Sequence, residues 1–311
     1  VGADLAAQAE AAAGPGTVVS GCHYLADVGR IAIRNSAGLE VSFRFSRASV
    51  HLTCGVREGM QAGAYSSACH GYAGGDLDPR ALGAQVSSLA KARSQARRAG
   101  GERGPLVLSP GAAAQLSALC TPMAGGSPGE SPGGSDAVGS QAVTLLDDPR
   151  LPSGYGSTPF DGEGVATKTC AFVEMGVRTA RAHTCASGAA AGCPSTGHAV
   201  RPDFAFPPRL GFHNLHLAPT PGAPRDLVRE VREGLYLVEF GDVSPRTPAR
   251  GFSGWGFRIR GGELAEPLVW DMPGMTLGEM LLRLKAVGQD LATYPGGVGG
   301  ATCLFDSVAV S

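Results

Sequence analysis

The sequence predicts an α+β protein, with a small amino-terminal α/β domain before a large antiparallel β-rich domain that carries a few packed helices. Three observations predict this fold class. The 47 glycines and 22 prolines among 311 residues favour turn-rich β structure over a helix bundle. Alternating apolar residues near the start of the chain indicate a β-hairpin. From Val143 onward, short apolar runs alternate with glycine and proline turns, which is typical of antiparallel sheets.

The amino-terminal domain is expected to span residues 1–103 and to begin with that hairpin. Apolar residues alternate on both sides of the loop 35–38, which ends in a glycine. Residues 50–54 are expected to add a third strand. A helix should then begin at Asp78-Pro79, because Asp is a favoured N-cap and Pro fits the first helical turn. An apolar stripe indicates the helix, which is expected to end at Gly100-Gly101.

The carboxy-terminal domain is expected to span residues 104–311. A short buried strand at 105–108 should lead through Ser109-Pro110-Gly111 into a helix that ends at Leu119. Two more helices are expected, one from Pro224 to Gly234 and one from Thr276 through Val287, where Glu279 completes a capping box. The low-complexity segment 124–137 has no apolar anchor and is expected to be a flexible surface loop.

Composition excludes some classes of function. The 26 basic and 27 acidic residues nearly balance, so the chain has no electrostatic footprint for nucleic acid. No run of 18 apolar residues predicts a membrane span, and the start lacks the basic region of a signal peptide. The missing initial Met suggests that upstream sequence is absent. The eight scattered cysteines fit reduced thiols in the cytoplasm, with a secreted disulfide protein as the alternative.

Five sequence blocks resemble the TldD/TldE (PmbA-type) metallopeptidase family, and most closely its TldE subunit. They occur in the family's order from the middle of the chain onward. The blocks are Ser157–Val165 (STPFDGEGV), Ser195–Ala199 (STGHA), Gly211–Asn214 (GFHN), Val287–Leu291 (VGQDL) and Leu304–Val310. The segment 200–210 is expected to be an insertion relative to the family pattern.

The resemblance implies that metal chemistry belongs to another chain. TldD subunits carry a His-Glu-x-x-x-His helix that binds zinc, whereas here the corresponding segment 112–120 contains neither His nor Glu. The family's cysteine ligand in a Cys-Gly turn is replaced by the glycine-rich segment 295–300. We therefore expect no metal in this chain and zinc in a TldD-like partner.

The same blocks nominate site residues. The expected substrate-binding residues are Phe160, Asp161, Glu163, Thr196, Gly197, His198 and Asn214. His198, Glu163 and His213 are weak candidates for acid/base catalysis, because converging acids and imidazoles can be tuned toward neutral pKa values. Each has a structural alternative: Asp161 and Glu163 straddle a glycine as turn residues do, and His198 could be a hydrogen-bonded core residue. Asp147-Asp148 is also expected to form a turn.

Other catalytic arrangements have little support. His213 and His216 would point to opposite faces of a strand, which argues against a shared ion. Gly-x-Ser-x-Gly occurs around Ser127 and Ser131, but without the strand and helix that a nucleophile elbow needs.

The leading functional hypothesis is a non-catalytic TldE-like subunit. It would pair with a TldD-like zinc metallopeptidase, or with itself, to enclose a cleft where small or modified peptides are processed. The alternative is a stand-alone, metal-independent enzyme that acts on a peptide-like metabolite in natural-product biosynthesis. A third possibility is a binding module without a reaction. Co-purification with a TldD-like chain would separate the third hypothesis from the first, and a neighbouring small-molecule biosynthetic gene cluster would support the second.

Overall fold

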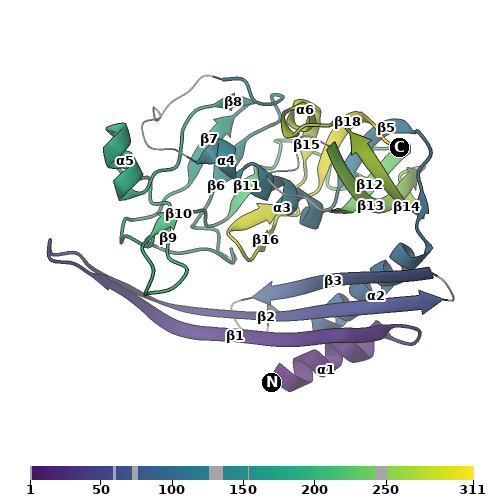
Figure 1. Cartoon of the computed structure of the whole chain (residues 1–311), viewed down its shortest axis with the longest axis horizontal. Coiled ribbons are helices and arrows are strands. Elements are labelled where there is room, and N and C mark those ends of the chain that lie inside the picture. Colours follow the sequence, from purple (N-terminus) through teal and green to yellow (C-terminus); the bar gives the residue numbers. More distant parts are fainter. Residues whose placement is uncertain (1, 59–60, 72–75, 126–135, 153, 242–250) are drawn as a thin grey trace. The chain divides into compact units, whose positions relative to one another are not determined.

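The computed structural model describes residues 2–58, 61–71, 76–125, 136–152, 154–241 and 251–311 (Figure 1). The chain is an α+β protein, which is the fold class that the sequence predicts. It divides into two compact units. The first unit comprises Val1–Ala32, Ser42–Arg97 and Glu266–Leu268. The second comprises Ile33–Val41, Arg98–Ala265 and Val269–Ser311.

The first unit is a three-stranded sheet with two helices. The strands β1 (Val18–Arg34), β2 (Glu40–Glu58) and β3 (Gln61–Gly71) lie in the order β1-β2-β3. The predicted hairpin is confirmed, and the side chain of Asn35 holds its loop by accepting from the backbone N–H groups of Ala37 and Leu39. The predicted third strand at 50–54 is wrong. Those residues continue β2 without a break and pair with β3.

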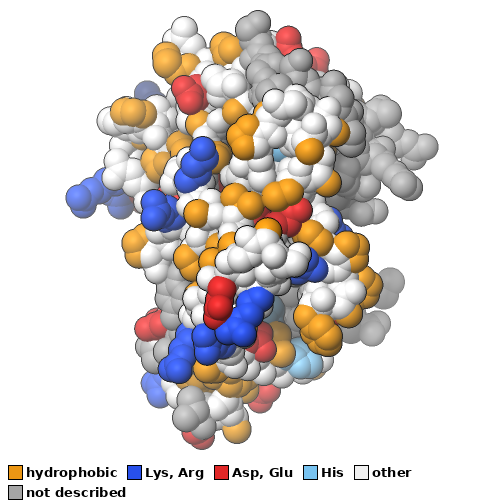
Figure 2. Space-filling view, turned by 90° about the vertical axis from the view of Figure 1, so that its left-hand side faces the viewer, with side chains coloured by type: hydrophobic (Ala, Val, Ile, Leu, Met, Phe, Trp, Pro, Cys, Tyr) orange, Lys and Arg blue, Asp and Glu red, His pale blue; other side chains and the backbone are white. Residues whose placement is uncertain are grey.

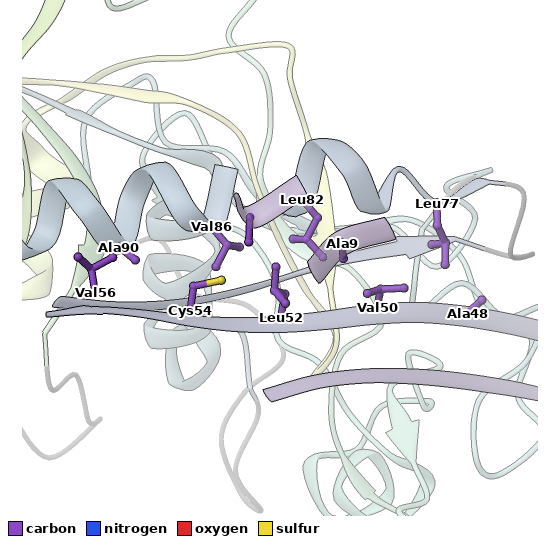
Figure 3. Close-up of a cluster of buried hydrophobic side chains, with 11 residues drawn as sticks. Ala9, Ala48, Val50, Leu52, Cys54, Val56, Leu77, Leu82, Val86 and Ala90 are labelled. Carbon is purple, nitrogen blue, oxygen red and sulfur yellow. The ribbon is translucent and has the colours of Figure 1, made fainter. Parts of the chain in front are cut away.

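Helices α1 (Gly2–Ala13) and α2 (Pro79–Gln95) pack on one face of this sheet. Figure 3 shows Val50, Leu52 and Cys54 of β2 directed toward the helices, as the period of two in a strand requires. Gly83 makes the close helix contact possible, since a Cβ there would lie 2.1 Å from the carbonyl oxygen of Ala9.

The predicted N-terminus of α2 is confirmed, but its predicted end is wrong. The carboxylate of Asp78 accepts a 2.9 Å hydrogen bond from the backbone N–H of Ala81. The helix ends at Gln95 and not at Gly100, because the chain beyond it turns into sheet structure. The backbone N–H of Ala99 donates to the carbonyl of Val269 in β14 (Glu263–Pro273).

The second unit contains two large sheets and one small one. A seven-stranded sheet has the order β15-β18-β5-β12-β13-β14-β4, a six-stranded sheet has the order β16-β17-β11-β6-β7-β8, and β10 pairs with β9. Two parallel pairs, β5 with β12 and β11 with β17, make both large sheets mixed. The strands not bounded above are β4 (Arg97–Arg98), β5 (Arg103–Leu108), β6 (Leu145–Asp147), β7 (Cys170–Glu174), β8 (Val177–Arg178), β9 (Ala199–Val200), β10 (Arg209–Leu210), β11 (Leu215–Leu217), β12 (Glu233–Phe240), β13 (Gly251–Arg260), β15 (Leu284–Val287), β16 (Ala292–Tyr294), β17 (Val298–Gly300) and β18 (Cys303–Ala309).

Helix α3 (Pro110–Leu119) is buried between strands of both large sheets, including β12 and β17. Its predicted start is confirmed. The hydroxyl of Ser109 accepts from the N–H of Ala112 and donates to the carbonyl of Val238. Gly300 of β17 lies directly against the helix, because a Cβ there would be 2.2 Å from the carbonyl oxygen of Pro110. The short helix α4 (Thr121–Ala124) follows.

Two helix predictions in this unit need correction. Residues 224–234 form turns and the start of β12, because the carboxylate of Asp226 accepts from the N–H of Val228 and so stabilises a local turn. The helix with the Thr276–Glu279 capping box is confirmed as α6, but it covers only Leu277–Leu282. Leu284 and Val287 belong to β15, which pairs with β18.

All eight cysteines are free in the structure. Most of the low-complexity segment 124–137 lies outside the described residues. Within the described parts of the chain, no helix has the length and apolar character needed to cross a membrane.

Candidate functional site

The centre of the candidate site is Asp147, the last residue of β6, whose side chain is fully buried. Both of its carboxylate oxygens lie 3.1 Å from the backbone nitrogen of His213, and one also accepts a 2.6 Å hydrogen bond from the N–H of Asn214. Strand pairing explains the arrangement, because β6 runs antiparallel to β11 with Leu215 opposite Asp147. The carboxylate therefore anchors the segment that enters β11.

His198 lies beside this carboxylate. Its Nε2 is 3.2 Å from Oδ2 of Asp147, although the direction is not that of a hydrogen bond. Its Nδ1 lies 2.9 Å from the hydroxyl of Thr196. The rings of Phe172 and Phe212 enclose the imidazole at centroid distances of 5.2 and 5.7 Å. We place the proton on Nε2, because the nearby carboxylate disfavours a lone pair on that nitrogen and because Nδ1 can then accept from the hydroxyl of Thr196.

His213 is also part of the interior. Its Nε2 donates a 3.0 Å hydrogen bond to the carbonyl of Gly197, and burial lowers the pKa of the imidazole although the Asp147 carboxylate opposes that shift. Gly197 has a φ of 79°, which favours glycine, and a Cβ there would lie 3.1 Å from the carbonyl oxygen of Ala166. This buried imidazole is held neutral by its surroundings.

The carboxylates of Asp161 and Glu163 both accept hydrogen bonds from backbone N–H groups. The buried carboxylate of Asp161 accepts from the N–H groups of Glu163, Val165 and Ala199 at 2.9–3.0 Å. The half-buried carboxylate of Glu163 accepts a 2.7 Å hydrogen bond from the N–H of Cys185, the first residue of helix α5 (Cys185–Ala191). Asp161 thus stabilises the predicted turn, and Glu163 stabilises the start of a helix.

The remaining nominated residues are equally tied to the backbone. The side chain of Asn214 accepts from the N–H of Gly156 and donates to the carbonyl of Asp148 at 2.7 Å. The hydroxyl of Thr196 accepts a 2.7 Å hydrogen bond from the N–H of His183. Phe160 is buried. The polar side chains of this group therefore form hydrogen bonds with backbone groups inside the second unit.

The structure brings most of the nominated residues together around Asp147, which the sequence had assigned only to a turn. Of the nominated side chains, those of Glu163 and Thr196 keep partial exposure. A signal for Asp147 was present in the sequence, because it follows Leu145 at a spacing of two and so shares the inward face of its strand. Buried groups that already have partners support a scaffold and offer little to a substrate in solution.

A catalytic zinc does not fit the residues present on α3. The helix carries alanine, glutamine, leucine and serine side chains where ligands and a general base would be needed. Among the residues that the structure describes, no group of three or more His, Cys, Asp or Glu side chains could hold a metal ion. His213 and His216 do not form a pair of ligands. His216 Nδ1 donates to the carbonyl of Asn214, and His213 donates to Gly197.

Acidification should destabilise this part of the fold through His213. Its pKa is lowered on folding, so the unfolded chain binds the proton more tightly, and stability falls as the pH drops below about 6.5. His213→Gln should lower the free energy of unfolding at pH 7.5 by about 1 kcal/mol and make its decline between pH 6.5 and 4.5 shallower. Urea unfolding followed by tryptophan fluorescence measures both. Parallel pH profiles for the variant and the wild type would contradict the assignment.

Comparison with known proteins assigns the chain to a family. Residues 2–94 match the PmbA/TldA metallopeptidase central domain and residues 101–311 match its C-terminal domain. A metalloprotease of Archaeoglobus fulgidus is 33% identical over 177 residues, and the metalloprotease PmbA of Escherichia coli O157:H7 is 29% identical over 164. Those matches span 54% and 51% of this chain but only 39% and 34% of the relatives' own lengths.

Solved structures show the same fold. TldE from Thermococcus kodakarensis superimposes with a TM-score of 0.86 at 19% identity, covering 100% of this chain and 74% of its own. A Thermotoga maritima protein described as a putative modulator of a DNA gyrase gives 0.85 at 21% identity, covering 99% and 73%. With both domain matches together covering most of the sequence, the chain belongs to the TldD/TldE (PmbA-type) metallopeptidase family.

Proposed function

We propose that this chain is a TldE-like, non-catalytic subunit. It pairs with a TldD-like zinc metallopeptidase and helps to enclose a cleft in which small or modified peptides are processed. An extended peptide would bind there mainly through main-chain hydrogen bonds, with side-chain pockets for selectivity. The zinc, held by the partner, supplies an activated water for hydrolysis.

The observation that carries the proposal is that helix α3 is present but has no His, Cys, Asp or Glu side chain that could bind a metal. The Ser109-Pro110-Gly111 entry of the family's metal helix is retained, and Ser109 caps the helix. The helix is packed through small side chains, and Gly300 brings the backbone of β17 against it. The fold thus keeps the element on which its catalytic relatives depend, while its side chains serve packing.

The burial of the histidines argues against the stand-alone enzyme. General acid/base catalysis needs a group within hydrogen-bond reach of the substrate. His198 is fully buried between two phenylalanine rings, and His213 donates its Nε2 proton to a backbone carbonyl. Glu163 is occupied at the start of α5. These contacts support the subunit proposal over the alternative.

Reconstitution tests the proposal. The chain, a TldD-like chain from the same genome, and their mixture are each incubated with zinc and fluorescein-labelled, denatured casein. We expect hydrolysis only from the mixture, and loss of that activity when the glutamate of the partner's His-Glu-x-x-x-His motif is replaced by glutamine. The partner mixed with an unrelated protein is the control. Hydrolysis by the chain alone at the rate of the mixture would refute the proposal.

A further inference from the structure

Strand β1 is the outer edge of the sheet in the first unit. The sheet has the order β1-β2-β3, so within the described residues β1 has a neighbouring strand on one side only (Figure 1). From Val18 to Ala32 it contains neither the lysines nor the prolines that commonly protect such edges. Leu25 is 57% exposed and Val28 is 84% exposed. An apolar edge of this kind is a template for pairing with another strand.

The sequence of this edge is self-complementary about Leu25. Going outward from Leu25, residues of similar or complementary type occur at equal distances on both sides. The mirrored pairs are Tyr24 and Ala26, His23 and Asp27, Cys22 and Val28, Gly21 and Gly29, Ser20 and Arg30, Val19 and Ile31, and Val18 and Ala32. Two antiparallel strands related by a two-fold axis at Leu25 would place each residue directly opposite its mirrored partner.

The charged residues are complementary in this arrangement. Asp27 of one copy would lie opposite His23 of the other copy, and the two-fold axis repeats the pair. Opposite residues on one face of a sheet have Cβ atoms about 5 Å apart, close enough for the imidazole to donate to the carboxylate. Both side chains are exposed in the single chain. A shift of the register by two residues would place Asp27 opposite Leu25 or Gly21, so the charges favour one register.

Pairing in this register also covers the apolar side chains. The Leu25 side chains of the two copies would meet at the axis. Val28 would lie beside Cys22 of the other copy, and Cys22 is already packed against the core formed with helices α1 and α2. Strand alternation places Cys22 and Val28 on the same, helix-covered face of the sheet. The exposed valine of each copy would therefore extend the hydrophobic core of the other.

The edge also has the space and the length that pairing needs. A hollow of about 500 Å³ at its middle is lined by Cys22, His23, Tyr24, Leu25 and His51. Beyond Ala32 the strand ends in Arg34, which forms an ion pair with Glu40 of β2. Figure 2, which faces the side where Figure 1 shows the tip of this hairpin, has basic and acidic side chains close together. The edge before these charges would form about 15 main-chain hydrogen bonds, whereas a standard interface has about 10.

We propose that a second copy of this chain pairs with β1, antiparallel and in register about Leu25, so that two copies form one continuous six-stranded sheet. The inference goes beyond the proposed function, because it concerns the chain alone and no TldD-like subunit takes part. A peptide would also add to a free edge. It would not account for a strand that is complementary to itself.

Charge exchange in the full chain tests this register. His23→Asp leaves only acidic side chains at the two charged positions, and His23→Lys combined with Asp27→Lys leaves only basic ones. The wild type should dimerise with a dissociation constant of about 10 µM, measured by sedimentation velocity. We expect each charged variant alone to self-associate at least about tenfold more weakly, because like charges then lie opposite each other. An equimolar mixture of the two should regain the affinity of the wild type or exceed it.

Substitutions outside the first unit provide the controls. Leu282 is 60% exposed on α6 in the second unit. Leu282→Asp and Leu282→Lys introduce similar charges there and should leave self-association unchanged. Circular dichroism verifies that all variants fold.

Each outcome supports or overturns the inference. A wild-type chain that stays monomeric at about 100 µM overturns it, and so does a mixture that associates no better than its two components. Unchanged self-association of both charged variants also overturns it, because the contact then lies elsewhere. If His23→Asp leaves self-association unchanged but weakens binding of the TldD-like chain or slows casein hydrolysis, the edge belongs to that partner or to the peptide. Self-association is measured without a TldD-like chain, so failure of the proposed function leaves this result interpretable.

Discussion

Asp147→Ala is expected to lower the free energy of unfolding of the second unit by about 3–5 kcal/mol. The carboxylate is fully buried and accepts from the N–H groups of His213 and Asn214. Its removal leaves two buried donors without an acceptor and removes the charge that faces His198. Both tryptophans, Trp255 and Trp270, lie in this unit, so urea unfolding followed by their fluorescence measures the loss.

The neighbouring carboxylate provides the control for this prediction. Asp148 accepts from the N–H of Arg150 and the hydroxyl of Thr169, and it is partly exposed. Asp148→Ala should cost about 1 kcal/mol, since water can replace a lost partner there. If the two variants lose equal stability, Asp147 is not the anchor of the buried cluster.

Gly300→Ala is expected to cost about 3 kcal/mol or more and to reduce the yield of folded protein. The added methyl group would lie 2.2 Å from the carbonyl oxygen of Pro110 and 2.3 Å from the nitrogen of Ala114. Both neighbours are backbone atoms of α3, so neither can move without displacing the helix from β17. Thermal unfolding monitored by circular dichroism gives the measurement.

Gly278→Ala is the matched substitution in the same unit. Apart from its chain neighbours and the backbone of its own helix, no heavy atom lies within 4 Å of the added methyl group, and the position is helical in α6. We expect a gain of about 0.5–1 kcal/mol, because alanine loses less conformational entropy in a helix than glycine. Equal melting temperatures for the Gly300 and Gly278 variants would show that the contact between β17 and α3 is looser than described.

Local signals predicted the parts of the fold that depend on neighbouring residues. Asp78, Ser109 and Thr276 each cap the helix that the sequence places after them. The loop at 35–38 closes its hairpin through Asn35. Such contacts span a few residues, so residue type and spacing suffice to identify them.

Strand pairing between segments far apart in the sequence determined the secondary structure where local sequence signals predicted it wrongly. Residues 224–234 have a helical pattern, but the pairing of β12 with β5 and β13 draws Glu233 onward into a strand. Residues 284–287 continue an apolar helical stripe, yet they pair with β18. Asp147 meets the N–H of His213 across 66 residues, a contact that one sequence does not encode by spacing. Several of the nominated residues therefore lie close together in the fold, around an aspartate that the sequence assigned only to a turn.

Zinc stoichiometry tests the central claim most directly. The purified chain, the TldD-like partner and their complex are dialysed against zinc-free buffer after loading, and bound zinc is measured by mass spectrometry. We expect less than a tenth of an equivalent on this chain alone, and one equivalent in a one-to-one complex. A full equivalent of tightly bound zinc on the isolated chain would contradict the claim that its α3 serves packing and leaves metal chemistry to the partner.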